Sequence, residues 1–140
     1  MIYRLADEKD FPQLAQMRWD FRQESGEEIA VVSHAEFIEN CLEFLQNEAK
    51  NYAYWITEND GEIVSHIFVH RINLVPRPCR IKDAFAYLTN TYTKPNFRGK
   101  GIGGKLLQKT VSASLPRRLH IPSSRLSRWS LPFSFRSLQP

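Results

Sequence analysis

The chain has 140 residues, of which 42% are hydrophobic, and a formal net charge of +4 at pH 7. This size predicts one domain, and two cysteines are too few for a disulfide-rich scaffold. No run approaches the roughly 18 apolar residues of a membrane span, so no membrane partner is expected. The N-terminus is not typical of a signal peptide, which predicts a cytoplasmic protein.

The pattern of apolar residues predicts a mixed α/β domain. Asp7 can cap a first helix, and Ser33-x-x-Glu36 is a capping box that opens a second one. Asn59-Asp60-Gly61 is typical of a hairpin turn between two strands. We expect strands over residues 2–5, 52–58, 62–70 and 84–93, and helices over residues 8–22, 34–48 and 101–113.

Two histidines lie four residues apart in the second strand of the expected hairpin. His66 and His70 share one face of that strand, but a metal site would need a third ligand. We therefore interpret them as exposed or partly buried strand residues and expect no metal. Cys41 falls on the apolar face of the second helix and is interpreted as a core thiol.

A glycine-rich segment, Arg98-Gly99-Lys100-Gly101-Ile102-Gly103-Gly104-Lys105, follows the last expected strand and leads into the last helix. Glycines let main-chain N–H groups converge at the positive end of a helix, which is favourable for phosphate. The segment therefore predicts a phosphate-bearing ligand. The alternative is a turn that holds no ligand.

Three phosphate-binding patterns compete for these residues. The dinucleotide pattern needs an acidic residue about 20 positions further on, but no Asp or Glu follows Asp83. The P-loop pattern needs Ser or Thr where Leu106 stands. The remaining pattern is Arg-x-x-Gly-x-Gly, formed by Arg98, Gly101 and Gly103.

With Thr93-x-Pro95 before it and Leu106-Leu107 after it, this pattern resembles motif A of the GCN5-related N-acetyltransferase (GNAT) superfamily. The resemblance implies a mostly antiparallel mixed sheet flanked by helices. It also implies acetyl-CoA as cosubstrate and acetyl transfer to the amine of a small molecule. The alternatives are a non-catalytic coenzyme-A-binding remnant or a domain with a basic nucleic-acid-binding arm.

The resemblance also implies which residues hold the coenzyme. Main-chain groups of the last expected strand should contact the pantetheine arm, and one N–H there should polarise the thioester carbonyl. The pyrophosphate should lie on the glycine segment. The expected coenzyme-binding residues are Thr91, Tyr92, Thr93, Arg98, Gly99, Lys100, Gly101, Ile102, Gly103 and Gly104.

Catalytic residues are not assigned from the sequence. Asp83 is the acid nearest to the last strand and is interpreted as a strand-end charge. Relatives often use a tyrosine further along as general acid, but no tyrosine follows Tyr92. Acids between the first two helices, Glu24, Glu27 and Glu28, could attract a cationic amine.

The chain changes character near its C-terminal end. Residues 1–83 hold all 15 acids, and residues 112–140 hold eight Ser, five Arg and four Pro with no sustained periodicity. We divide the chain into a GNAT-like part, 1–111, and an aberrant tail, 112–140, which we interpret as the product of a frameshift or truncation. The C-terminal part of the fold would then be missing or replaced, and activity low or absent.

A genuine basic arm is the alternative explanation of the tail, but a nucleic-acid partner is not expected. The strand 84–93 would otherwise expose an open sheet edge. Pairing with a neighbouring chain in a homodimer is one way of covering that edge.

Overall fold

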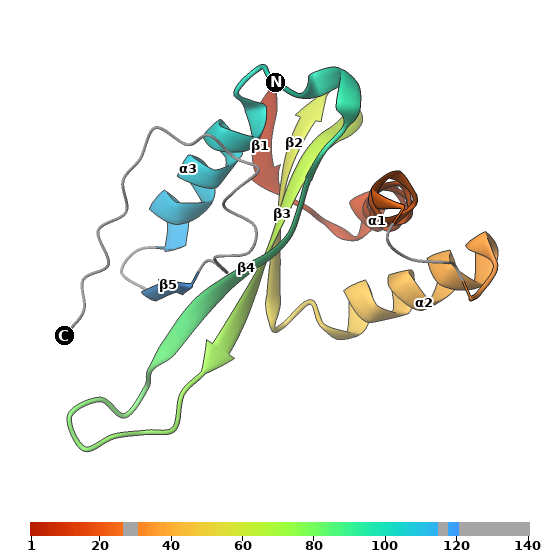
Figure 1. Cartoon of the computed structure of the whole chain (residues 1–140). Helices are drawn as coiled ribbons and strands as arrows, with labels where there is room; N and C mark the ends of the chain where they lie inside the picture. Colours follow the sequence, from red (N-terminus) through yellow and green to blue (C-terminus); the bar gives the residue numbers. More distant parts are fainter. Residues whose placement is uncertain (27–30, 115–117, 121–140) are drawn as a thin grey trace.

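The computed structural model describes residues 1–26, 31–114 and 118–120, and its centre is a five-stranded sheet (Figure 1). The strands lie in chain order: β1 (Ile2–Leu5), β2 (Tyr52–Asn59), β3 (Glu62–Asn73), β4 (Ala84–Thr93) and β5 (Arg118–His120). Neighbouring strands are antiparallel from β1 to β4, and β5 pairs in parallel with β4. This is the mixed, mostly antiparallel α/β sheet that the sequence predicts.

Helices cover both faces of this sheet (Figure 1). On one face lie α1 (Phe11–Ser25) and α2 (His34–Asn47), and α1 packs Phe11, Leu14 and Met17 into a core with Tyr54 and Phe68 of the sheet. On the other face, α3 (Ile102–Ser114) packs Leu106 against Ile67, Val69, Ala86 and Leu88. Alternate residues of β3 therefore serve two separate cores.

The predicted elements are confirmed, and the largest boundary differences are three residues. α1 begins at Phe11 rather than residue 8 and ends at Ser25 rather than residue 22, and β3 ends at Asn73 rather than residue 70. The first helix is preceded by a separate 3-10 turn, Glu8–Asp10, and it is this turn that Asp7 caps. Pro12, in the first turn of α1, has no N–H to donate. The strand expected to end at residue 70 continues to Asn73, because Arg71, Ile72 and Asn73 still pair with β4.

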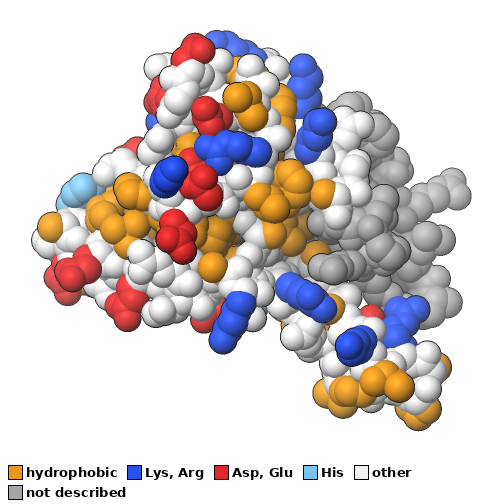
Figure 2. Space-filling model, turned by 180° about the vertical axis from the view of Figure 1, so that it is seen from behind, with side chains coloured by type: hydrophobic (Ala, Val, Ile, Leu, Met, Phe, Trp, Pro, Cys, Tyr) orange, Lys and Arg blue, Asp and Glu red, His pale blue; other side chains and the backbone are white. Residues whose placement is uncertain are grey.

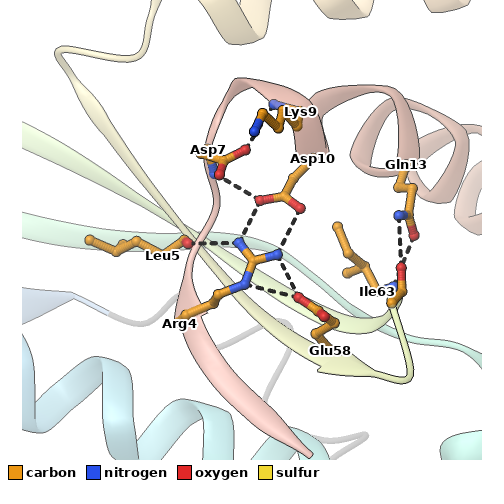
Figure 3. Close-up of polar contacts among 9 residues, drawn as sticks. Arg4, Leu5, Asp7, Lys9, Asp10, Gln13, Glu58 and Ile63 are labelled. Atoms are coloured by element: carbon orange, nitrogen blue, oxygen red, sulfur yellow. Dashed lines mark hydrogen bonds and ion pairs between the residues drawn. The ribbon is translucent and has the colours of Figure 1, made fainter.

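An arginine joins three of these N-terminal elements (Figure 3). Arg4 of β1 donates to Asp10 at 2.6 and 2.9 Å and to Glu58 of β2 at 2.6 and 3.0 Å. Nearby, Gln13 of α1 accepts a hydrogen bond from Ile63 N at 2.9 Å. These contacts hold α1 against the β2–β3 hairpin.

The β3–β4 hairpin projects beyond the rest of the sheet (Figure 1). Its connecting segment carries exposed Val75 and Ile81. Figure 2 shows hydrophobic and basic side chains close together at the projecting end. No helix within the described ranges is both long enough and apolar enough to cross a membrane.

Only part of the expected tail is described. Helix α3 ends at Ser114, three residues beyond the expected division at residue 111, and β5 pairs with Phe85, Ala86 and Tyr87. Residues 115–117 and 121–140 lie outside the description. The division at residue 111, and the idea that the C-terminal part is missing or replaced, remain predictions.

Candidate functional site

The glycine segment forms an open loop between β4 and α3. A short 3-10 turn, Pro95–Phe97, leads from β4 into Arg98, and the loop ends where α3 begins at Ile102. Gly99 and Gly101 both have φ of 74°, in the left-handed region that other residues rarely adopt. A Cβ placed on either glycine would meet no heavy atom of the described residues within 4 Å. The loop therefore has space for a ligand beside its main chain.

The beginning of α3 adds main-chain donors to this space. Lys105 N donates to Gly101 O at 3.0 Å and closes the first turn. The N–H groups of Ile102, Gly103 and Gly104 precede this bond and have no partner within the helix. Gly101 has no side chain to cap them, and no acidic residue lies in the first turn. This end of α3 can therefore bind an anion through its main chain.

The side chain of Arg98 is committed to other partners. Its two terminal nitrogens donate to Glu24 of α1 at 2.5 and 2.7 Å, and its Nε donates to Thr93 O at 2.8 Å. The guanidinium also lies 5.4 Å from the centre of the Tyr92 ring. Arg98 can thus contribute its main chain to the loop while its side chain anchors the loop to α1.

The end of β4 is held by polar contacts with β3. Tyr92 and Thr93 are buried, and Ser65 Oγ lies 2.8 Å from Thr93 Oγ1 and donates to Tyr92 O at 3.1 Å. Burial raises the pKa of Tyr92 to about 12, so its phenol stays protonated at neutral pH. Thr91 is half-buried beside them. The structure brings these three residues and the glycine loop together at one end of the sheet.

A β-bulge precedes these residues in β4. The register shifts between His66 and Phe68, and Asn90 has φ of 47°. Arg18 of α1 donates to Asn90 Oδ1 at 2.8 Å. Sequence reasoning missed Arg18 and Asn90; the available signal was an Asn inside an aromatic strand, because Asn tolerates the left-handed conformation better than most residues.

His66 lies beside the bulge and is completely buried, so the expectation of an exposed or partly buried side chain is wrong at this position. Within the described residues, neither ring nitrogen has a partner in hydrogen-bonding geometry. Burial, together with the nearby charge of Arg18, lowers the pKa of His66 to about 3, so the ring is neutral at physiological pH. His70 instead stacks on Tyr52 at 4.4 Å. No group of three potential metal ligands occurs in the part of the chain that is described.

A hollow of about 430 Å³ lies on the α1 side of this site. Two of its acids are paired with bases, Glu24 with Arg98 and Glu62 with Lys94 at 2.5 Å. Glu24 is therefore engaged rather than free for a cationic amine, and Glu27 and Glu28 lie outside the described residues. The lining residues are Asp20, Glu24, Glu62, Tyr92, Lys94, Pro95, Asn96 and Phe97.

Asp83 lies at the other end of β4 from the glycine loop. It accepts from Arg77 at 2.8 Å and from Arg80 at 3.4 Å, and the hydrogen bond from Arg77 lowers its pKa. These contacts close the turn of the projecting hairpin. Asp83 is a strand-end charge, as interpreted from the sequence, and is remote from the glycine loop.

The model of the acetyltransferase (GNAT) family matches residues 11–121. A search of proteins with curated functions gives no match. The fold is similar to that of a predicted acetyltransferase with acetyl-CoA from Clostridium acetobutylicum, at 22% identity and a TM-score of 0.69, covering 99% of this chain and 94% of that chain.

Two further solved structures share the fold. A GCN5-related N-acetyltransferase from Ralstonia eutropha JMP134 is 18% identical, with a TM-score of 0.70 over 99% of this chain and 97% of that one. A glucosamine-6-phosphate N-acetyltransferase from Arabidopsis thaliana is 15% identical, with a TM-score of 0.64 over 99% of this chain and 95% of that one.

Proposed function

We propose that this protein, which belongs to the GNAT family of acetyltransferases, transfers the acetyl group of acetyl-CoA to the amine of a small molecule. The observation that carries the proposal is the glycine loop between β4 and α3. Gly99 and Gly101 turn its main chain through left-handed conformations, and the space beside them is open. The first N–H groups of α3 have no partner within the helix, and its first turn holds no acidic residue. These features suit the pyrophosphate of acetyl-CoA.

Each part of the site has a distinct role in this proposal. The main chain from Arg98 to Gly104 binds the pyrophosphate, and the main chain from Thr91 to Thr93 pairs with the pantetheine arm. An N–H at this end of β4 stabilises the negative charge that develops on the thioester oxygen. Holding donor and acceptor side by side can lower a barrier by ~7–11 kcal/mol in well-oriented systems.

The reaction is an acyl transfer. The nitrogen of a neutral amine attacks the thioester carbonyl carbon, a C–N bond forms, the C–S bond breaks, and coenzyme A leaves as the thiol after the amine has lost a proton. The hollow beside Tyr92 and Asp20 is the side from which we expect the amine to approach. We assign no residue to the proton transfer.

Binding of acetyl-CoA, measured by isothermal titration calorimetry, tests the coenzyme part of the proposal. Gly101→Ala should weaken binding at least tenfold, because Ala disfavours the positive φ and its methyl group would occupy the loop. Gly61→Ala is the matched control, since Gly61 also has a positive φ, 81°, but lies in the β2–β3 turn. No binding by the wild-type chain would refute the coenzyme site.

Turnover tests the transfer step. The wild-type chain should release thiol from acetyl-CoA in the presence of one or more amines from a panel of amino sugars, polyamines and amino acids. Binding of acetyl-CoA without turnover on any amine would favour the second candidate, a non-catalytic coenzyme-A-binding domain. That candidate rests on the same glycine loop and requires no acid or base.

A further inference from the structure

The β-bulge in β4 lies just before the residues proposed to meet the thioester. His66 pairs with Tyr92 and Phe68 pairs with Thr89, so two residues of β4, Asn90 and Thr91, stand opposite Ile67 alone. Such a bulge leaves one residue out of the ladder and turns the strand locally. The direction of the main chain at Thr91 therefore depends on the conformation of Asn90.

The conformation of Asn90 is held from outside the sheet. Its φ of 47° is unusual for a residue with a side chain, and the residue is only 7% exposed. Arg18, at the middle of α1, donates its Nη1 to Asn90 Oδ1 at 2.8 Å. A hydrogen bond in which one partner is charged is stronger than one between two neutral groups.

Packed rings surround the contact between Arg18 and Asn90 and restrict the positions that the two side chains can adopt. His66 is completely buried on the neighbouring strand, and its ring lies 5.0 Å from that of Phe68 and 6.0 Å from that of Tyr92. Arg18 itself lies 5.9 Å from the Phe21 ring on α1. The Arg18 side chain therefore extends from α1 to the β4 bulge in a region packed with aromatic rings.

We infer that Arg18 and Asn90 are positioning residues that hold the β4 bulge so that its main chain polarises the thioester carbonyl of bound acetyl-CoA. This inference rests on the proposed function. It assigns no direct contact between either side chain and the coenzyme. The two side chains act on the thioester carbonyl only through the main chain of β4, whose direction they set.

A spectroscopic experiment tests this role separately from folding and from coenzyme affinity. Acetyl-CoA labelled with ¹³C at the thioester carbonyl is bound to the full chain, and the carbonyl resonance is compared with that of the free compound. A hydrogen bond to the carbonyl moves this resonance downfield. We expect the wild-type chain to produce such a shift, and Arg18→Met or Asn90→Ala to lose most of it at saturating ligand, because Ala disfavours the positive φ and removes the acceptor of Arg18.

Three controls accompany these variants. Arg22→Met removes the same charge from α1, and Arg22 also lies 5.9 Å from the Phe21 ring, so this variant should keep the wild-type shift. Asn90→Asp keeps an oxygen acceptor for Arg18 and should keep most of it. The double variant Arg18→Met/Asn90→Ala should lose no more than Asn90→Ala alone, because the two residues act as one contact.

Different results would overturn the role of Arg18 and Asn90 and the proposed function. A wild-type chain that binds no acetyl-CoA would overturn both. Binding with an unchanged carbonyl shift in Arg18→Met and Asn90→Ala would overturn the inference alone, as would an equal loss in Arg22→Met. Should Arg18→Met fail to fold, as judged by circular dichroism, Asn90→Ala and Asn90→Asp still decide. Loss of the shift in the first and retention in the second support the inference, and any other pair of results contradicts it.

Discussion

Arg98 and Glu24 form a two-pronged ion pair that ties the glycine loop to the last turn of α1, with N–O distances of 2.5 and 2.7 Å. The two residues are 74 positions apart. Their side chains are 45% and 39% exposed, so solvent screens much of the attraction. The pair is therefore better suited to orienting the loop than to stabilising the fold.

Glu24→Gln should change the free energy of unfolding by less than about 1 kcal/mol, as is usual for exposed ion pairs. Urea denaturation followed by tryptophan fluorescence measures this change. The same variant should show the wild-type stability in high salt. A loss of several kcal/mol would mean that the pair has a structural role well beyond that of a surface contact.

Arg98→Ala should weaken acetyl-CoA binding less than Gly101→Ala does. The reason is that the Arg98 side chain is engaged with Glu24 and Thr93 O, whereas the loop is expected to bind phosphate through its main chain. Calorimetric titration of both variants with acetyl-CoA gives the comparison. Equal losses would indicate that side-chain charge, rather than the main-chain donors, holds the ligand.

His66→Leu should flatten the dependence of stability on acidic pH. The folded pKa of His66, about 3, is below its ordinary value of 6.5, so the unfolded chain binds an extra proton between these values. Its stabilising contribution is present above pH 6.5 and is lost as the pH falls toward 3, by ~1.4 kcal/mol per pH unit. Urea titrations at several pH values should show this slope in the wild-type chain. An equal slope in the variant would exclude His66 as its origin.

Arg4→Met should destabilise the fold by about 2 kcal/mol, because it leaves the buried carboxylate of Asp10 without its principal donor. Hydrogen bonds from Arg4 lower the pKa of Asp10 below 3.8. Their contribution is therefore present above pH 3.8 and is lost as the pH falls through the lower, folded value. The difference in unfolding free energy between wild type and variant, measured at pH 7 and near pH 2.5, should shrink at the lower pH. A difference that stays constant would argue against a charged Asp10 as the cause.

Deletion of residues 121–140 should leave the affinity for acetyl-CoA within about twofold of the wild-type value, if the tail is not part of the acetyltransferase site. The proposed coenzyme-binding residues all lie between Thr91 and Gly104, which is the reason for this expectation. Calorimetry on both chains provides the measurement. Salt-sensitive binding of DNA or RNA by the full chain, lost on deletion, would instead support a basic arm.

Local patterns explain why much of the fold could be predicted from the sequence. The Asn59-Asp60-Gly61 turn places Asp60 and Gly61 at φ of 51° and 81°, and Ser33 accepts from Glu36 N at 3.2 Å. Each of these features depends on residues a few positions apart. The glycine spacing from Gly99 to Gly104 is equally local, so a loop joining a strand to a helix could be predicted without knowing what packs around it.

The tertiary structure alone decided which side chains meet at the site. Asn90 is paired with a residue 72 positions away, and the burial that keeps His66 neutral comes from packing between α1 and the sheet. The sequence separates these groups, and no periodic signal joins them. The sequence determined the loop because main-chain conformation there follows from glycine itself, whereas the role of Arg18 follows from where the packing of α1 places it.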